Sequence, residues 1–313
     1  MRVLVTGASG FVGRHAVTAL LRAGAEVHAV AREGLPLNWR PLDCPPLDCP
    51  WYNLDLLDSE SARGVVRQVR PDAVLHLAWC VEHGRFWTDP ANADWVGATL
   101  VLARAAIEAG VQHFTGVGTC YEYDWPAAAD CHERDTPVVG HTLYDIAKSS
   151  CRSVLDALFA AQGLDFAWAR LFFLYGPDED RRRLVASVAQ ALASGQAARC
   201  SQGLAVRDFM DVRDAGAALA AVTLSGLSGA VNVGSGQGAR IADVALMLGQ
   251  LAGRPDLIKL GSLPDRPDEP SRIVADTARL RNEIGFSARF DLETGLRETL
   301  EFWRAKTAAD RVG

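Results

Sequence analysis

Three glycines near the N-terminus constrain the fold of this chain more than any other feature. Gly7, Gly10 and Gly13 stand between a short apolar run and a stretch with helical periodicity. In such a loop the first glycine permits a tight turn, the second lets the backbone approach a ligand, and the third lets helix and strand pack closely. The free N–H groups at the start of the following helix attract phosphate. The pattern therefore predicts a strand, a dinucleotide-binding loop and a helix.

Strand-like apolar runs alternate with amphipathic stretches through the first half of the chain. The predicted strands are 2–6, 26–31, 73–78, 112–118 and 165–171. The predicted helices are 11–23, 59–69, 92–109 and 142–162. This alternation is typical of βαβ units, so it predicts an α/β Rossmann fold: a doubly wound parallel sheet with helices on both faces. The ligand should lie at the carboxyl ends of the strands.

The pattern loosens after Gly176-Pro177. Helices are expected near 182–194, 212–224, 241–252 and 292–305, and short strands near 203–209 and 230–233. We expect residues 1–172 to form the dinucleotide-binding domain, to which the chain returns near 204–240. The segments 173–203 and 241–313 should then form a smaller, interleaved α/β substrate-binding part.

Composition excludes several classes of protein. The chain has 313 residues, 49% of them hydrophobic, and a formal net charge of -6 without a basic tract, which argues against nucleic-acid binding. No apolar run reaches the ~20 residues of a membrane helix, and the N-terminus does not read as a signal peptide, so we expect a cytoplasmic protein. Seven scattered cysteines without a CxxC pair predict reduced thiols and no metal site. The proline-rich duplication at 41–50 predicts a loop, to which we assign no function.

The end of the second predicted strand bears on the choice of cofactor. NAD-binding folds usually place Asp or Glu there to bond the ribose 2′-hydroxyl. Residues 27–32 contain no acid and end on Arg32, where a 2′-phosphate would lie, and Arg14 could reach the same phosphate. We therefore favour NADP(H) over NAD(H), with stacking on adenine or simple solvation as the other readings of Arg32. Asp55, in the segment Asn53-Leu54-Asp55-Leu56, could bond the adenine amino group.

A tyrosine and a lysine four residues apart suggest the chemistry. Tyr144 and Lys148 should share one face of a helix, and an adjacent ammonium lowers the pKa of a phenol, which is ordinarily ~10. Thr119, at the end of the strand 112–118, supplies a hydroxyl for the oxygen being transformed. Lys148 can also hold the nicotinamide ribose. The set predicts hydride transfer with Tyr144 as the acid-base.

With these residues in place, the chain resembles the extended short-chain dehydrogenases/reductases that act on nucleotide sugars, the NAD-dependent epimerase/dehydratase family. The segments that carry the resemblance are Thr6 to Gly13, His76-Leu77-Ala78, Gly118-Thr119 with Tyr123, Tyr144 with Lys148, Arg170 to Pro177, Arg207-Asp208-Phe209, Arg266 to Pro270, and Asp276. The resemblance implies that Arg207 and Arg266 grip the diphosphate of a nucleotide-diphosphate sugar, a geometry that suits two guanidinium groups. It also implies a homodimer formed through the helices near 92–109 and 142–162.

Departures from the family pattern reduce the number of reactions that we expect this chain to catalyse. The 4,6-dehydratases carry Asp-Glu directly after the catalytic Thr, whereas this chain has Cys120 and Tyr121, which makes dehydration improbable. Phe173 and Trp95 stand where the family has asparagines, so we do not carry over the substrate contacts that the asparagine side chains make in the family. The aromatic and charged loop 79–87 should line the sugar site. In it His83, like Tyr121, is a candidate second proton donor or acceptor, but either could simply pack.

These inferences give two sets of site residues. The cofactor should be lined by Gly7, Ser9, Gly10, Phe11, Val12, Gly13, Arg14, Arg32, Asp55, Leu56, Leu77, Ala78 and Lys148. The substrate should meet His83, Tyr121, Phe173, Arg207 and Arg266.

The primary hypothesis is NADPH-dependent reduction of a nucleotide-linked 4-keto-6-deoxyhexose, because a reductase consumes cofactor whereas an epimerase regenerates it. A nucleotide-sugar 4-epimerase with tightly bound NAD is the close alternative. A small-carbonyl reductase and a non-catalytic NADP-binding regulator are the remaining hypotheses.

Overall fold

The computed structural model describes residues 1–32, 49–125, 129–267 and 269–310. Most of the proline-rich duplication at 41–50 lies outside these residues. Within them, seven strands form one parallel sheet in the order β10-β6-β5-β4-β1-β2-β3. The strands are β1 (Arg2–Thr6), β2 (Glu26–Ala31), β3 (Trp51–Asn53), β4 (Ala73–His76), β5 (His113–Thr119), β6 (Asp165–Leu171) and β10 (Gly229–Val233).

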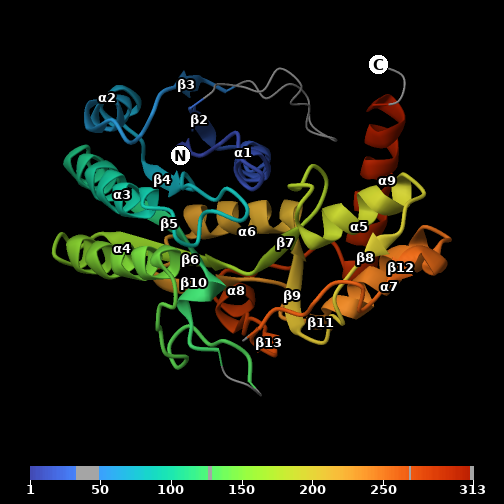
Figure 1. Ribbon diagram of the computed structural model, residues 1–313. Helices are drawn as coiled ribbons and strands as arrows, with labels where there is room; N and C mark the ends of the chain where they lie inside the picture. Colours follow the sequence, from blue (N-terminus) through green and yellow to red (C-terminus); the bar gives the residue numbers. More distant parts are fainter. Residues whose placement is uncertain (33–48, 126–128, 268, 311–313) are drawn as a thin grey trace.

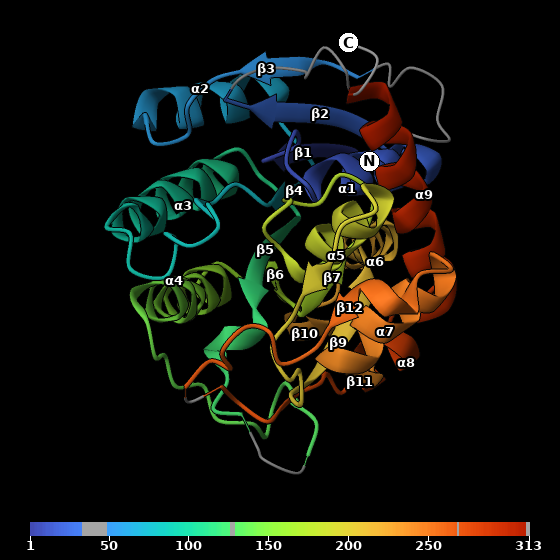
Figure 2. The same ribbon diagram turned by 45° about the vertical axis from the view of Figure 1, so that its right-hand side comes forward.

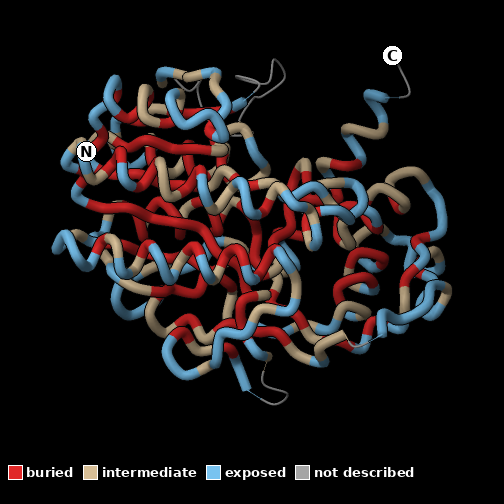
Figure 3. Tube along the Cα trace, turned by 60° about the vertical axis from the view of Figure 1, so that its left-hand side comes forward, coloured by how far each residue is buried: buried red, intermediate tan, exposed pale blue. Residues whose placement is uncertain are grey.

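Helices cover both faces of this sheet. On one face α1 (Gly13–Arg22) packs against α6 (Val212–Ser225), and on the other α2 (Ser59–Val69), α3 (Ala91–Glu108) and α4 (Leu143–Ala160) lie in a row (Figure 1). The inner strands run as largely buried segments between the two layers, whereas the edge strand β3 is partly exposed (Figure 3). Each face has its own apolar core. The predicted Rossmann α/β fold is therefore confirmed.

A second, smaller group of elements lies beside the carboxyl ends of the large sheet (Figure 2). Its central strand, β9 (Val206–Asp211), pairs with β7 (Phe173–Tyr175), β11 (Gly238–Arg240) and β13 (Arg272–Ile273). Helices α5 (Leu184–Ala193), α7 (Ile241–Leu251) and α9 (Leu292–Asp310) share a third core there. The remaining elements are η1 (Cys120–Glu122), β8 (Ala198–Arg199), η2 (Pro255–Leu257), β12 (Ile258–Lys259) and α8 (Ala278–Asn282).

The longer predicted elements agree with the structure to within a few residues. The helix expected at 11–23 begins at Gly13, because Phe11 and Val12 belong to the turn of the glycine loop. The strand expected at 203–209 lies three residues later, at 206–211. Strands of two or three residues, such as β8, β12 and β13, were missed because so short a run has no detectable periodicity.

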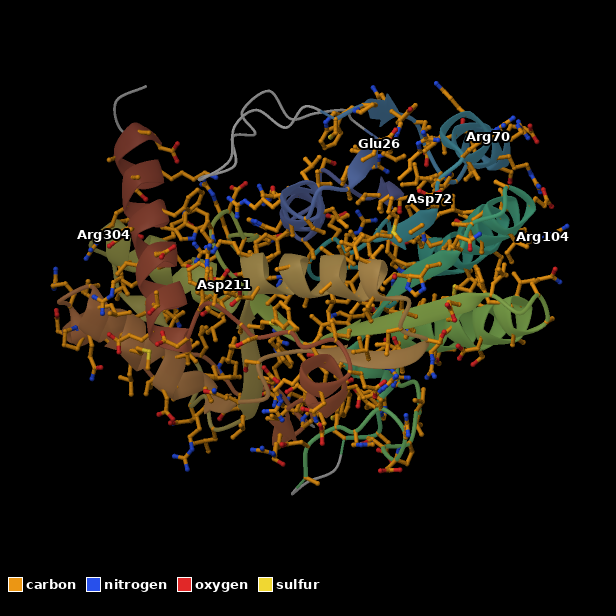
Figure 4. The ribbon with its side chains drawn as sticks, turned by 180° about the vertical axis from the view of Figure 1, so that it is seen from behind. Glu26, Arg70, Asp72, Arg104, Asp211 and Arg304 are labelled. Atoms are coloured by element: carbon orange, nitrogen blue, oxygen red, sulfur yellow. The ribbon has the colours of Figure 1, made fainter. Side chains whose placement is uncertain are left out.

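Charged side chains close the amino ends of the strands. Arg2 pairs with Glu26 at 3.0 Å, and the Arg2 backbone N–H donates to Asp72 at 2.6 Å. Figure 4 places Glu26 and Asp72 on one side of the molecule and Asp211, the N-cap of α6, on the other, near α9.

In the described part of the chain no helix is long and apolar enough to cross a membrane. The same residues contain no group of three His, Cys, Asp or Glu side chains placed to hold a metal ion.

Candidate active site

The glycine loop joins β1 to α1 in a conformation that only glycine tolerates. Gly7 has φ +68°, and a Cβ there would lie 2.7 Å from the Ala78 backbone nitrogen. A Cβ on Gly13 would lie 2.1 Å from the carbonyl oxygen of Gly7. Gly10 is exposed, and no side chain caps the N-terminus of α1. The loop thus leaves a bare backbone and the positive end of the helix dipole for an anion, which fits the pyrophosphate of a dinucleotide.

The predicted cofactor residues line one edge of the sheet, on both sides of this loop. Ser9, Phe11 and Val12 belong to the loop itself, and Leu77 and Ala78 follow β4 directly and are partly buried. This arrangement results from the parallel pairing of β1 with β2 and β4, because parallel strands bring their carboxyl ends to the same edge.

The adenine end of this edge carries exposed side chains. Arg32 follows β2 and is exposed. Asp55 follows the neighbouring strand β3, is also exposed, and accepts the Leu57 N–H at 3.0 Å, while Leu56 is buried. Because β2 and β3 are parallel neighbours, Arg32 and Asp55 leave the sheet at the same edge.

The guanidinium of Arg14, which was expected to bind a phosphate, is hydrogen-bonded to an aspartate. Its guanidinium donates to the Asp178 carboxylate at 2.7 Å and to the Asp178 carbonyl oxygen at 3.3 Å. Lys306 of α9 binds the other oxygen of Asp178 at 2.6 Å. Arg14 and Asp178 border a cavity of about 600 Å³ next to Phe11. The structure therefore pairs Arg14 with Asp178, which lies in the smaller part of the molecule.

Thr119 and Tyr144 meet at the carboxyl end of β5. Thr119 ends the strand, is buried, and caps η1 by accepting the Tyr121 N–H at 3.3 Å. Tyr144 lies in the first turn of α4, where its backbone N–H donates to the Trp87 carbonyl oxygen at 3.2 Å. The ring of Phe86 meets the Tyr144 ring edge-on at 4.8 Å. These contacts fix a phenol beside a hydroxyl in a water-poor setting.

The expected lowering of the Tyr144 pKa is not found. Burial raises the pKa of Tyr144, the negative charge of Glu122 raises it further, and a hydrogen bond with the Thr119 side chain opposes both. Lys148 shares the buried face of α4 with Tyr144, but its ammonium donates to the Val117 carbonyl oxygen at 2.8 Å. Burial lowers the pKa of Lys148 to about 7. The prediction from helix spacing was wrong on this point, because spacing does not report desolvation.

A buried carboxylate beneath Thr119 was missed by the sequence reasoning. Glu122 accepts the Thr119 backbone N–H at 2.9 Å, the Arg170 Nε–H at 2.8 Å and the Trp168 indole N–H at 3.0 Å. The Glu122 and Arg170 side chains are both 0% exposed. A Cβ on Gly118 would lie 2.1 Å from the Trp168 indole nitrogen, so this glycine makes room for the tryptophan. Glycines on alternate positions of β5 were the one signal that could have suggested a large partner.

The predicted substrate residues gather on the side of the smaller sheet. The Arg207 side chain is buried, pairs with Glu269 at 3.0 Å and lies over the Phe173 ring at 5.4 Å. Tyr121 meets the same ring edge-on at 6.0 Å. Burial raises the pKa of Tyr121, and the positive charges of Arg207 and Arg266 partly offset it. Arg266 is exposed. The structure thus brings two arginines and two aromatic rings to one place.

The side chains of the loop after β4 differ in how far they are buried. Trp79 and Phe86 are buried against α3 and α4, whereas His83 is only half-buried. Burial lowers the pKa of His83, and the charge of Arg183 lowers it further. The charge of Asp180 opposes both effects, so the charged groups that act on His83 most come from the segment before α5. Phe86 contacts the Tyr144 ring and Trp79 contacts the Lys148 ammonium, and the expectation that this loop lines the sugar site stays a prediction.

Glu179 is a second buried carboxyl group that the sequence reasoning missed. It precedes α5 and is 4% exposed. Burial raises its pKa to about 8, against the opposing effects of Arg183 and the Ala186 backbone N–H. A carboxyl group with this pKa is mostly protonated at pH 7.

Comparisons with known proteins agree with this geometry. Residues 3–234 match the model of the NAD dependent epimerase/dehydratase family. The chain is 28% identical to the dTDP-glucose 4,6-dehydratase of Streptomyces niveus, over 98% of this chain and 94% of that protein. It is 29% identical to the GDP-6-deoxy-D-mannose reductase of Pseudomonas aeruginosa, over 97% of this chain and 98% of that protein.

A solved structure is similar over nearly the full length. The UDP-glucose 4-epimerase of Thermus thermophilus, in complex with NAD, superimposes with a TM-score of 0.83 at 26% identity, covering 97% of this chain and 99% of that chain. Family model, relatives and fold agree. This chain therefore belongs to the NAD dependent epimerase/dehydratase family and is an NAD(P)-dependent enzyme.

Proposed function

We propose that this enzyme reduces a nucleotide-linked 4-keto-6-deoxyhexose at C4 with NADPH. The observation that carries the proposal is the pairing of Thr119 with Tyr144 at a site where the next two residues, Cys120 and Tyr121, provide no carboxylate. Elimination of water from a sugar needs an acid and a base beside the C4 oxidation, and burial raises the pKa of both Cys120 and Tyr121. Thr119 and Tyr144 can serve only one proton transfer, at a single oxygen. Reduction of a ketone needs one such transfer.

The chain's own residues would act on the C4 carbonyl in turn. Bound reduced nicotinamide supplies the hydride that C4 accepts. Tyr144 donates its phenolic proton to the C4 oxygen, so that the carbonyl becomes a hydroxyl, and the phenolate is then reprotonated from solvent. Because burial raises the pKa of Tyr144, the phenol is fully protonated at neutral pH, the state a reductase needs. Thr119 orients the same oxygen, and Lys148 would hold the nicotinamide ribose.

The preference for NADPH rests on the adenine end of the site. The end of β2 offers the exposed Arg32 and no carboxylate through residue 32. A guanidinium group is suited to a 2′-phosphate, which it binds through two parallel hydrogen bonds. Asp55 remains the candidate for the adenine amino group, because it leaves the neighbouring strand at the same edge.

The substrate's diphosphate would lie between the two arginines of the smaller part. Arg207 is held by Glu269 and by the Phe173 ring, whereas Arg266 is exposed at the rim. Aromatic side chains of Trp87, Tyr121 and Phe173 provide an apolar wall beside Tyr144. A sugar with a methyl group in place of the 6-hydroxyl suits such a wall, because burying a methyl group leaves no polar atom unpaired.

A 4-epimerase with tightly bound NAD is the second candidate. UDP-glucose 4-epimerases of Azospirillum brasilense and Rhizobium leguminosarum are each 27% identical to the chain over at least 96% of its length. The same Thr119, Tyr144 and Lys148 would serve that reaction. It differs in needing no added cofactor, since each cycle restores the oxidised form.

We further propose a cytoplasmic homodimer with the two interleaved parts expected from the sequence. The α3–α4 face carries the outward-facing apolar residues Ile146 and Val154, each 48% exposed. Apolar side chains one or two helical turns apart on a helix surface favour packing against a second copy. The thiols of Cys80, Cys120, Cys131, Cys151 and Cys200 are free, which fits a reducing compartment.

The test is the absorbance of NADPH when the purified enzyme meets a panel of nucleotide-linked 4-keto-6-deoxyhexoses. Loss of the reduced-nicotinamide band with one of them, and a slower loss with NADH, is the expected result. Recovery of NAD from the denatured enzyme, together with interconversion of 4-epimeric sugar nucleotides and no loss of the band, would replace the reductase by the epimerase.

A further inference from the structure

The Lys148 ammonium lies over the face of a tryptophan. Its Nζ is 3.7 Å from the centroid of the Trp79 ring, well inside the distance at which a cation is attracted to an indole face. Lys148 is 5% exposed and Trp79 is 9% exposed. Little water therefore competes for the charge, and a desolvated cation–π contact is stronger than an exposed one.

The Trp79 ring is itself held in a fixed plane. Its indole N–H donates to the Asn92 side-chain oxygen at 2.8 Å, and the Asn92 amide donates to the carbonyl oxygens of Phe86 at 2.7 Å and Asp89 at 2.9 Å. Asn92 is 0% exposed. Trp79 also stacks on Trp95 of α3, with ring centroids 6.3 Å apart. The loop after β4 and the first turns of α3 thus support the indole that lies against α4, the helix beside α3 (Figures 1 and 2).

We propose that Trp79 is a positioning residue for Lys148, with its indole face holding the ammonium in place and Asn92 fixing the plane of that indole. The ammonium donates one of its three N–H groups to the Val117 carbonyl oxygen and lies over the ring, and it keeps donor capacity for a ligand. This assignment rests on the proposed function only in that Lys148 serves there as the ligand of the nicotinamide ribose.

The charged and titratable groups around Lys148 do not replace the ring. Cys151 of α4 and Glu122 of η1 both favour the charged lysine, but burial outweighs them and lowers its pKa to about 7. His76 of β4 is also nearby, and burial lowers its pKa to about 3, so it stays neutral near pH 7. Tyr144 is one turn away on the same helix and stays protonated. A second indole, that of Trp168, has its centroid 5.9 Å from the Lys148 Nζ, against 3.7 Å for Trp79, so removal of Trp79 should disfavour the ammonium more than removal of Trp168.

The first measurement reads Trp79 directly and needs no turnover. Tryptophan emission is followed from about pH 6 to about pH 9 in the wild type and in Trp79→Phe, and the difference gives the Trp79 contribution. We expect that contribution to change with a midpoint near pH 7, the pKa of Lys148, and to stay constant in a Lys148→Met background. A Trp79 contribution that changes equally with and without Lys148 would overturn the proposal.

The second measurement is the affinity for NADPH, determined by calorimetry. Trp79→Leu should bind roughly tenfold more weakly and Trp79→Phe by an intermediate amount, following the strength of the remaining π face. The double variant Trp79→Leu with Lys148→Met should bind no more weakly than Lys148→Met alone, because both changes remove one interaction. Additive losses would show that Trp79 acts only through packing.

Two controls complete the experiment. Trp303→Phe removes a buried tryptophan from α9, with lysine and arginine groups 5.3–5.5 Å from its ring, and should leave the pH midpoint of the Trp79 contribution unchanged. Asn92→Ala should shift the midpoint in the wild type but not in the Trp79→Phe background. A wild type that binds no NADPH would contradict the proposed function, while the emission titration would still decide the role of Trp79.

Discussion

The two ends of the sheet's carboxyl edge hold their side chains in opposite ways. At the β5 end, Tyr144, Lys148 and Glu122 are buried, and each is fixed by partners from other elements. At the β2 end, Arg32 and Asp55 are exposed. This difference indicates that the protein itself positions the reacting groups before a ligand binds. The choice of cofactor depends instead on single side chains at the surface. Substitutions should therefore have large effects at the first end and small, selective effects at the second.

The largest effect is expected from Tyr144→Phe. The change removes one oxygen from a buried ring and leaves the contact with Phe86 in place. Loss of the acid-base should lower kcat at least about a thousandfold, near the upper range for such groups, with little change in the affinity for NADPH. Single-turnover assays with the active sugar nucleotide measure it. Turnover within a few-fold of the wild type would break the assignment of the buried end as catalytic.

Removal of the Glu122 charge should have the next largest effect, on stability. Glu122→Gln leaves the fully buried Arg170 without its counter-charge, and breaking such a pair costs about 3–5 kcal/mol of unfolding free energy. Urea unfolding measures the loss, with Glu293→Gln in the exposed pair with Arg297 as the matched control, expected at about 0.5 kcal/mol or less. A second change, Arg170→Met, should restore part of the loss. Equal effects at the buried and exposed pairs would contradict this account.

The two arginines proposed for the substrate diphosphate should differ from each other. Arg207 is held by Glu269, so Arg207→Lys, which keeps the charge but loses the planar fork, should raise KM about tenfold or more. Arg266 is exposed, and Arg266→Lys should raise KM only about two- to threefold. Initial rates at saturating NADPH give both values. Unchanged KM in both variants would favour a small carbonyl substrate without a diphosphate.

The smallest effect is expected at Arg32, and it should be selective. Arg32→Ser should lower the ratio of kcat/KM for NADPH over NADH about tenfold, by weakening NADPH alone. Arg67→Ser, which removes an exposed arginine from α2, should leave the ratio unchanged. The ratio is measured with one sugar nucleotide and both cofactors. A parallel loss with NADPH and NADH would mean that Arg32 packs on adenine and does not read the 2′-phosphate.

Much of the fold and part of the site were determined by the sequence alone. The glycine loop, the alternation of strands and helices, and the spacing of Tyr144 and Lys148 are local patterns, and each reports a geometry that the backbone imposes within a few residues. The ends of the longer elements followed from the same patterns. The absence of carboxylates at positions 120 and 121 also needed no structure.

Only the tertiary structure decided how the reacting groups are held. Trp168 and Arg170 meet Glu122 across 46 and 48 residues of chain, and Arg14 meets Asp178 across 164. No local pattern reports such distant pairs, because they follow from the register of the sheet and the packing of helices on it. The same holds for the pKa values. The spacing on α4 suggested a lowered pKa for Tyr144, whereas burial raises the pKa of Tyr144. In the folded chain the Lys148 ammonium contacts the Val117 carbonyl oxygen and the Trp79 ring. Desolvation depends on everything that surrounds a group, and only the folded chain brings those surroundings together.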